Sequence, residues 1–344
     1  MQSAKRKGLV RALLLAAIAC TSAAAVAADA KFVLISHAPD SDSWWNTIKN
    51  AIKQAGEDFN VEVDYRNPPN GDLADMARMV EQAAARNYDG VIVSIADYNV
   101  LEKPMKQVVG KKIPLITINS GTLKQSEDLG AIMHVGQPEY EAGKGAGERA
   151  KAAGIKSFLC VNHYATNPAS FERCRGFAEA IGADVKKSTL DSGDDPTGIE
   201  GKVSAYLRNN SGTQAVLTLG PTSASPTLKA VDKMGLKGKI WFATFDLSED
   251  IAKGIKDGTI QFAIDQQPYL QGYIPVAVLA IMKKDKTTDL AKVKQELQGN
   301  AKFKARLAEY GLEPAYGPRH ISSGPGFVTK ENLPKVEKYA GQYR

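Results

Sequence analysis

The chain has 344 residues, of which 43% are apolar, and this is enough to build two domains with buried cores. Its formal net charge of +6 falls to +2 without residues 1–28, because that segment carries four basic residues and no acidic ones. The excess positive charge therefore belongs to the N-terminal segment, and we expect no nucleic-acid partner.

The N-terminal segment has the pattern of a secretory signal peptide. Basic residues within 5–11 precede an apolar run over 12–19, and small residues follow. We expect cleavage near Ala28, with Val26 and Ala28 as the small residues before the cut and Ala30 as an alternative. The apolar run is shorter than the ~20 residues of a membrane span, and no later segment reaches that length. The segment therefore predicts an exported protein.

A second interpretation of this segment makes Cys20 the lipid anchor of an exported lipoprotein. Ala17 stands three residues earlier, where such signals usually carry leucine. We therefore prefer a cleaved signal peptide over residues 1–28.

Nine apolar, β-branched runs predict strands in the rest of the chain. They are "FVLIS" (32–36), "VEVDY" (61–65), "GVIVSI" (90–95), "PLITIN" (114–119), "IMHVG" (132–136), "SFLCVN" (157–162), "AVLTLG" (215–220), "IWFATF" (240–245) and "IQFAID" (260–265). Amphipathic helical segments lie between most of them, which predicts parallel sheets covered on both faces. Nine strands exceed what one small open sheet usually holds. The sequence therefore predicts an α/β fold of two doubly wound, Rossmann-like lobes.

The last third of the chain contains a segment of different character. Residues 286–317 are charged and helical with little apolar content, which predicts a solvated surface insertion. Residues 318–344 then predict one more short strand, a Gly-Pro turn and a closing helix.

Two cysteines remain after the signal peptide, Cys160 and Cys174. Cys160 ends a predicted strand and Cys174 lies in the next predicted helix, so the two can face each other. An exported protein meets an oxidising compartment, which favours a disulfide. The alternative is two buried thiols that pack as small hydrophobic groups.

Polar residues follow the predicted strands. In open α/β sheets, ligands bind beyond the carboxyl ends of the strands. The residues at these ends are His37, Asp40, Asp42, Trp44, Trp45, Ser94, Asp97, Asn119, Ser120 and Gln137 in the first half, and Asn162, His163, Gly220, Thr222, Asp246, Asp265 and Gln266 in the second. Amides and carboxylates can bridge neighbouring hydroxyl groups, each of which both donates and accepts. The set therefore predicts a small neutral polyhydroxyl ligand, a sugar or polyol, and no cofactor.

Two adjacent tryptophans open the first predicted helix. Neighbours on a helix point about 100° apart, so Trp44 and Trp45 cannot both lie on its one buried stripe. We assign one ring to the helix–sheet core and the other to stacking against the apolar face of a sugar ring. The alternative is that both rings belong to the core.

Several quoted stretches resemble, in order and spacing, the periplasmic sugar-binding proteins of the ribose and galactose type, which are receptors of ABC importers. The stretches are "DSWWN", "IPLITIN", "VGQPEYEAGKGAGE", "FERCRGF", "TFDLS" and "AIDQQPYLQGY". The resemblance covers nearly the whole chain after residue 28. It implies the type I periplasmic binding protein architecture, a periplasmic monomer, and membrane permease subunits as partners.

The resemblance also implies a domain division and roles for individual residues. The division places residues 29–137 and 268–317 in the N-terminal lobe, and 138–267 and 318–344 in the C-terminal lobe, joined by a multi-strand hinge. The ligand-binding residues that the resemblance implies are Asp42, Trp44, Trp45, Ser94, Asn119, Gln137, Arg173, Asp194, Asp246 and Gln266, with Gln137 and Gln266 at crossings between the lobes. We expect His37 and His163 to bind ligand as well, because each ends a predicted strand. Ser248 can cap the helix after Asp246, which leaves that carboxylate free for a ligand.

Three features depart from the ribose type, and one is the first loop, which is longer here and carries His37. The other two are residue pairs. That type usually carries Asp-Arg where this chain has Asn119-Ser120, and Asn-Asp where it has Gly220-Pro221. The open alternatives are a polyol, an inositol, another pentose or hexose, and a furanose-like signalling molecule or chemotaxis ligand.

The other functions that we considered have weaker support. "GKGAGE" (143–148) does not join the first strand to its helix, so it fails as a dinucleotide motif, and its small residues predict helix–sheet packing. The four histidines lack metal-ligand spacing. Asp194 and Asp195 could serve an exported sugar-modifying enzyme as acid and base, but adjacent side chains point apart. A transcription regulator shares this fold but would lack the signal peptide. We therefore expect a binding protein and no enzyme.

Overall fold

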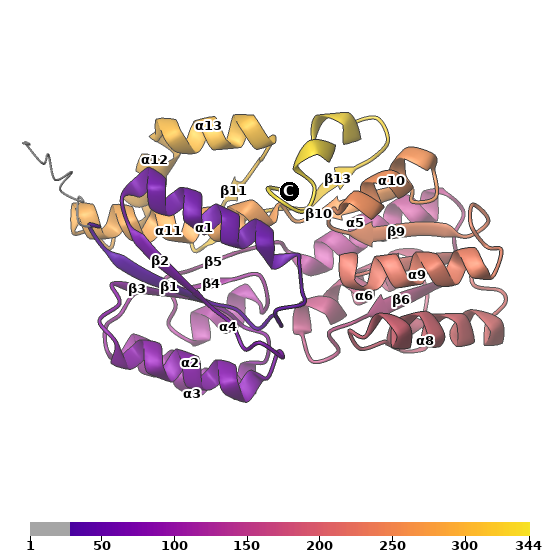
Figure 1. The fold of residues 1–344 in the computed structure, drawn as a ribbon, viewed down its shortest axis with the longest axis horizontal. Helices are drawn as coiled ribbons and strands as arrows, with labels where there is room; N and C mark the ends of the chain where they lie inside the picture. Colours follow the sequence, from indigo (N-terminus) through magenta and orange to yellow (C-terminus); the bar gives the residue numbers. More distant parts are fainter. Residues whose placement is uncertain (1–27) are drawn as a thin grey trace, which may run out of the picture.

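The computed structural model describes residues 28–344 and shows two lobes side by side (Figure 1). Each lobe has one largely parallel sheet with helices on both faces, which confirms the predicted fold class. The expected signal peptide and Cys20 lie outside the described residues. Within the described residues, no helix is long and apolar enough to cross a membrane.

The first lobe contains a seven-stranded sheet in the order β11-β12-β5-β4-β3-β1-β2. Its strands are β1 (Lys31–Ile35), β2 (Glu62–Arg66), β3 (Gly90–Ser94), β4 (Leu115–Ile118), β5 (Met133–Gly136), β11 (Ala315–Tyr316) and β12 (His320–Ser322). Its helices are α1 (Trp45–Phe59), α2 (Leu73–Ala85), α3 (Tyr98–Gly110), α4 (Leu123–Asp128), α11 (Pro268–Asp285), α12 (Leu290–Gly299) and α13 (Ala301–Tyr310). Only β11 is antiparallel to its neighbour.

The second lobe contains a six-stranded sheet in the order β13-β10-β9-β8-β6-β7, with β13 antiparallel. Its strands are β6 (Phe158–Asn162), β7 (Thr189–Asp191), β8 (Ala215–Thr218), β9 (Trp241–Phe245), β10 (Phe262–Asp265) and β13 (Gly326–Val328). Its helices are α5 (Glu139–Ala152), α6 (Pro168–Ile181), α7 (Val185–Ser188), α8 (Pro196–Asn209), α9 (Pro221–Lys233) and α10 (Glu249–Asp257). The nine predicted strands are all present, β12 of the first lobe is the further short strand predicted within 318–344, and the short strands β7, β11 and β13 are additional.

Alternate side chains of each central strand enter different cores. In β1, Phe32 and Leu34 pack under α1 and α11, whereas Val33 and Ile35 pack on the opposite side of the sheet. This is the two-residue period of a strand covered on both faces, and it explains why the strands appear in the sequence as continuous apolar runs.

The "GKGAGE" stretch packs α5 against α6. A Cβ atom on Gly143 would collide with the backbone of Arg173, and one on Gly147 would lie 2.7 Å from the carbonyl oxygen of Phe177. The expectation of helix–sheet packing holds only for the alanines of α5, such as Ala146, which enter the core on the sheet. The glycines of α5 allow its backbone to lie close to that of α6.

Three connections cross between the lobes, after β5, after β10 and after β12. The structure corrects one predicted boundary, which places all of 318–344 in the second lobe. Residues 320–322 form β12, which pairs with β5 of the first sheet and buries Ile321 in the first lobe's core. The third crossing therefore lies between β12 and β13.

The segment 286–317 is also more than a solvated insertion. It forms α12 and α13, and Val293, Leu297, Phe303 and Tyr310 are buried in the first lobe's core. Few apolar residues suffice because they fall on the inner face of each short helix.

The end of the chain packs on both lobes (Figure 1). It forms two 3₁₀ turns, Leu333–Lys335 and Glu337–Tyr339, so the prediction of a closing α-helix was wrong. Arg344 is buried, and its Nη2 atom lies 2.7 Å from Oδ2 of the fully buried Asp265. This ion pair ties the end of the chain to the second crossing.

Cys160 and Cys174 form a disulfide between β6 and α6. Both residues are fully buried against the second lobe's core. Of the two alternatives left open by the sequence, a disulfide or two buried thiols, the structure has the disulfide. The closed loop contains the whole connection between β6 and α6.

We expect the disulfide to form in exported protein and to stabilise the fold. Unreduced protein should be lighter by two protons than reduced protein, as measured by mass spectrometry. The loop of 14 residues predicts that the Cys160→Ala/Cys174→Ala variant loses about 3 kcal/mol of unfolding free energy. Two thiols that alkylate freely in denatured, unreduced protein would contradict the bridge.

Candidate functional site

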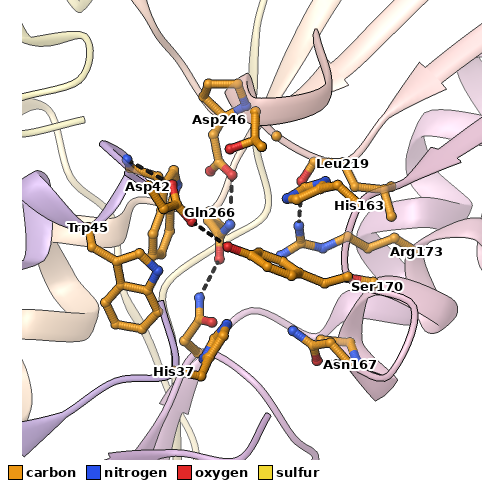
Figure 2. Close-up of a pocket in the computed structure, with 17 residues that line it drawn as sticks. His37, Asp42, Trp45, His163, Asn167, Ser170, Arg173, Leu219, Asp246 and Gln266 are labelled. Carbon is orange, nitrogen blue, oxygen red and sulfur yellow. Dashed lines mark hydrogen bonds between the residues drawn. The ribbon is translucent and has the colours of Figure 1, made fainter. Parts of the chain in front are cut away.

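A cavity of about 40 Å³ lies between the lobes, at the carboxyl ends of both sheets (Figure 2). Nine of the twelve predicted ligand-binding residues line it: His37, Asp42, Trp44, Trp45, Asn119, His163, Arg173, Asp246 and Gln266. They come from both lobes and from the second crossing. Most of the residues predicted from the ends of strands therefore lie around one cavity.

Three predicted residues do not line this cavity. Ser94 is buried below it, with its Oγ 2.9 Å from Nδ1 of His37. Gln137 is buried at the first crossing, where its Nε2 donates to Glu139 at 2.8 Å. Asp194 is exposed and lines two hollows outside the cavity. Ser94 and Gln137 can therefore orient other side chains, but the structure does not bring either of them to the cavity.

Several lining residues that the sequence did not predict lie in the connection between β6 and α6 or in the first turn of α6. The missed polar residues are Tyr164, Asn167 and Ser170. Asn167 caps α6 and Pro168 is its first residue. An Asn-Pro pair is a common signal for the start of a helix, and this signal could have placed the start of α6 beside the cavity. His163, which is predicted to bind ligand, lies in the same connection.

Asn119 and Asp246 occupy matching positions in the two lobes. Each follows a central strand, adopts a left-handed backbone with φ of 58° and 62°, and donates its N–H to the next strand, to Val135 and Ile264. Asn and Asp tolerate this conformation better than other residues with a Cβ atom. The two strand ends therefore present an amide and a carboxylate to the same cavity.

Gln266 links these two side chains across the lobes. Its Nε2 donates to Oδ2 of Asp246 at 2.8 Å, and its Oε1 accepts from Nδ2 of Asn119 at 3.3 Å. Asn119 also donates to Gln271 at 3.1 Å. Ser248 caps α10 as expected, so Asp246 is free to face the cavity.

Arg173 is a buried cation that is already paired. Its Nε and Nη2 atoms donate to the two carboxylate oxygens of Glu139 at 2.6 and 2.8 Å, and Nη1 donates to the carbonyl of Leu219 at 3.0 Å. Desolvation lowers its pKa, but Glu139 outweighs this effect and the pKa is raised. A guanidinium has five N–H groups, so two remain for a further acceptor.

The remaining titratable groups keep the cavity nearly free of uncompensated charge. Burial lowers the pKa of His37 to about 4 and that of His163 to about 3, so both rings are neutral at pH 7. Burial also raises the pKa of Asp42, and it raises the pKa of Asp246 to about 7 against the opposing effect of Arg173. No unpaired cation is present among the described lining residues.

Both tryptophans line the cavity, but they differ in burial. Trp45 is 2% exposed and belongs to the first lobe's core, whereas Trp44 is partly exposed and packs against that core. Their ring centroids lie 5.2 Å apart at 76°, and Trp45 also packs edge-on against His37. As expected, one ring is buried in the core and the other is less buried. Both rings, however, line the cavity.

Three buried polar atoms of lining residues have no hydrogen-bond partner among the described residues. They are Nε1 of Trp44, Nδ1 of His163 and Oδ1 of Asp246. Buried polar atoms are otherwise almost always satisfied, so these three can receive a ligand's polar groups.

Two hydrogen bonds join the lobes at the edge of the cavity. Tyr164 donates from its hydroxyl to Oδ2 of Asp42 at 2.9 Å, and Asn167 donates to Oγ of Ser120 at 2.9 Å. Oδ1 of Asp42 accepts from the backbone N–H of Trp44 at 3.1 Å. Each Asp42 oxygen thus has a partner within the protein, and the lobes are in contact.

Within residues 28–344, no group of acidic, histidine and cysteine side chains could hold a metal ion.

A family model described as a periplasmic binding protein domain matches residues 32–287. The xylose/arabinose-binding protein of Sulfolobus acidocaldarius is 21% identical over 72% of this chain, which spans 65% of that protein's length. The fructose import binding protein of Bifidobacterium longum is 22% identical, with 73% of this chain and 82% of that protein covered. The ribose import binding protein of Haemophilus influenzae is 24% identical, with 67% and 78% covered.

Solved structures share the fold. A carbohydrate transporter protein of Acidothermus cellulolyticus in complex with myo-inositol is 29% identical, with a TM-score of 0.78 and with 91% of this chain and 99% of that chain covered. A solute-binding protein of Agrobacterium vitis with bound D-fucose is 20% identical, with a TM-score of 0.72 and coverage of 90% and 99%.

We expect the carboxylate of Asp246 to destabilise the described fold, in which the two lobes are in contact, at high pH. Its pKa of about 7 in the folded protein exceeds the usual value, so the folded state holds a proton that the unfolded chain has lost above about pH 4. Unfolding free energy therefore falls as pH rises from about 4 to 7, by up to about 4 kcal/mol. Asp246→Asn should restore the lost unfolding free energy at pH 8 and change the unfolding free energy little at pH 4, as measured by denaturant unfolding.

The exposed Asp194 provides the matched control. Asp194→Asn should leave unfolding free energy unchanged at both pH values. An Asp246→Asn effect of equal size at pH 4 and pH 8 would show that the carboxylate's charge is not the cause.

Proposed function

The chain belongs to the family of periplasmic binding protein domains, and on this premise we propose that it is a periplasmic receptor which encloses a monosaccharide or cyclic polyol and delivers it to an ABC-type permease. It is a binding protein of the sugar-receptor type, and not an enzyme, because its relatives are binding proteins of sugar importers.

The set of unpartnered atoms carries this proposal. Trp44 offers a donor and Asp246 an acceptor from opposite lobes to the same cavity; neither atom has a partner within hydrogen-bond distance, although the Trp44 indole lies near enough to lower the pKa of the Asp246 carboxyl. A hydroxyl group both donates and accepts, so one hydroxyl can satisfy both atoms at once. The free N–H groups of Arg173 and the unpartnered Nδ1 of His163 provide sites for further hydroxyls. A ligand rich in hydroxyls matches this set.

The charges of the cavity favour a neutral ligand. Arg173 is neutralised by Glu139, and both lining histidines are uncharged at pH 7. A sugar phosphate or sugar acid would bury an anion beside Asp42 and Asp246 with no free cation to compensate it, at a large free-energy cost. We therefore assign the cavity to neutral sugars and polyols.

The relatives narrow the choice of first ligands to test. The most closely matching of the solved structures described above holds myo-inositol, a ring with a hydroxyl on every carbon. Such a ring has an apolar face of C–H groups that can pack on an indole. Myo-inositol is therefore the first ligand that we propose, with pentoses and hexoses next.

Closure around the ligand is the central test of this proposal. We expect a thermal-shift panel of myo-inositol, D-fucose, D-galactose, D-ribose, L-arabinose and D-xylose to identify a stabilising ligand, and sugar phosphates to have no effect. That ligand should bind with one-to-one stoichiometry and reduce the radius of gyration in small-angle scattering. Asn119→Ala and Asp246→Ala should each lower affinity by about tenfold or more. An unchanged radius at saturation would exclude closure, and turnover of the ligand would instead indicate an enzyme.

The two tryptophans should separate binding from stability. We expect Trp44→Ala to reduce affinity for the ligand by at least about tenfold with little loss of unfolding free energy. Trp45→Ala removes a core ring and should cost about 3–5 kcal/mol of unfolding free energy. Calorimetric titration and denaturant unfolding measure the two effects.

Trp241, which does not line the cavity, gives the control. Trp241→Phe should retain full affinity, and Trp44→Phe should keep part of it because a smaller aromatic face remains. Full affinity in both Trp44→Ala and Trp45→Ala would rule out stacking.

A further inference from the structure

Tyr164 separates the cavity from two larger hollows outside it. One hollow, of about 510 Å³, lies between the loop around Pro39 and the start of α9 and α10. The other, of about 250 Å³, lies beside Asn70 and Leu73. Among the described residues, Tyr164 is the one that lines the cavity and both hollows. Its side chain therefore stands where these three spaces meet.

Contacts to both lobes hold Tyr164 in this place. Its ring packs on His163 of its own lobe and edge-on against His37 of the other, with centroids 4.5 and 5.5 Å apart. Its hydroxyl donates to Oδ2 of Asp42 across the cleft. Because the ring touches both lobes, it can occupy this place only when they are closed.

The connection that carries Tyr164 is fixed at several points. The backbone N–H of Tyr164 donates to Oδ1 of Asn162 at 3.0 Å, and its carbonyl accepts from the N–H of Asn167 at 3.0 Å. The disulfide closes the same loop from β6 to α6. These bonds fix the backbone at Tyr164, and the contacts to His163, His37 and Asp42 fix the side chain.

We propose that Tyr164 is a specificity-determining gate: its ring excludes ligands substituted on the side that faces the outer hollows, and its bond to Asp42 delays ligand release. This inference rests on the proposed function, because it requires a ligand in the cavity. The two roles belong to different atoms of the side chain. The ring sets the size of ligand that fits, and the hydroxyl sets how long the closed state lasts.

The test uses positional mono-O-methyl ethers of myo-inositol and D-galactose beside the parent compounds. Wild-type protein should bind a parent and reject the ethers whose methyl group points toward Tyr164. Tyr164→Ala joins the cavity to the hollows, and it should accept at least one ether that wild-type protein rejects, with affinity within about tenfold of the parent. Calorimetric titration measures both affinities.

A second variant separates the hydroxyl from the ring. Tyr164→Phe should reject the same ethers as wild-type protein but release the parent about ten- to a hundredfold faster in stopped-flow displacement, because a hydrogen bond to a buried carboxylate is lost. Tyr206 donates to the carbonyl of Lys187 and lines none of the three spaces, so Tyr206→Phe should match wild-type protein in every assay.

The outcomes distinguish the gate from the receptor function. If a parent binds but Tyr164→Ala accepts the same set of ethers as wild-type protein, the gate is overturned and the receptor function stands. If Tyr164→Phe releases the parent at the wild-type rate, the role of the hydroxyl is wrong. If neither myo-inositol, D-galactose nor any of their ethers binds wild-type protein, the assignment of the cavity to these sugars fails and the gate fails with it.

Discussion

The buried ion pair between Arg173 and Glu139 organises the second lobe's side of the cavity. A charge removed from water must be paired and hydrogen-bonded, and breaking such a pair from one side typically costs about 3–5 kcal/mol. Glu139 begins α5 just after the first crossing, and Arg173 lies on α6. The pair forms because glycines at 143 and 176 let these helices approach closely. Gln137 and the end of β8 are then held by the same two side chains.

The cavity is built at the expense of stability. Asn119 and Asp246 adopt left-handed backbones, and buried polar atoms of Trp44, His163 and Asp246 lack partners. Such features cost free energy in the ligand-free fold and persist where the surrounding structure holds them in place. Under the proposed function, a ligand that satisfies these atoms recovers part of that cost only when both lobes surround it. The ligand then shifts the equilibrium toward the closed state by the difference between its binding free energies to the closed and open states.

The two lobes are also connected by contacts that need no ligand. Tyr164 and Asn167 reach from the second lobe to Asp42 and Ser120 of the first. Arg344 pairs with Asp265 beside the second crossing. The free energy of closure therefore includes contributions from residues on the rim and at the hinge, and affinity depends on them as well as on the cavity lining.

The sequence by itself determined the fold class, the nine central strands and most of the cavity, because periodicity and strand ends are local properties of the chain. Parallel strands must end at one edge of their sheet, so residues such as Asn119 and Asp246 could be predicted to meet a ligand there. Only the tertiary structure decided the rest. Gln137 and Ser94 turn toward Glu139 and His37, Asp42 is bonded to Tyr164, and β12 pairs with the first sheet. These outcomes depend on distances between segments far apart in the chain, and packing of the whole fold sets those distances, which no local pattern records.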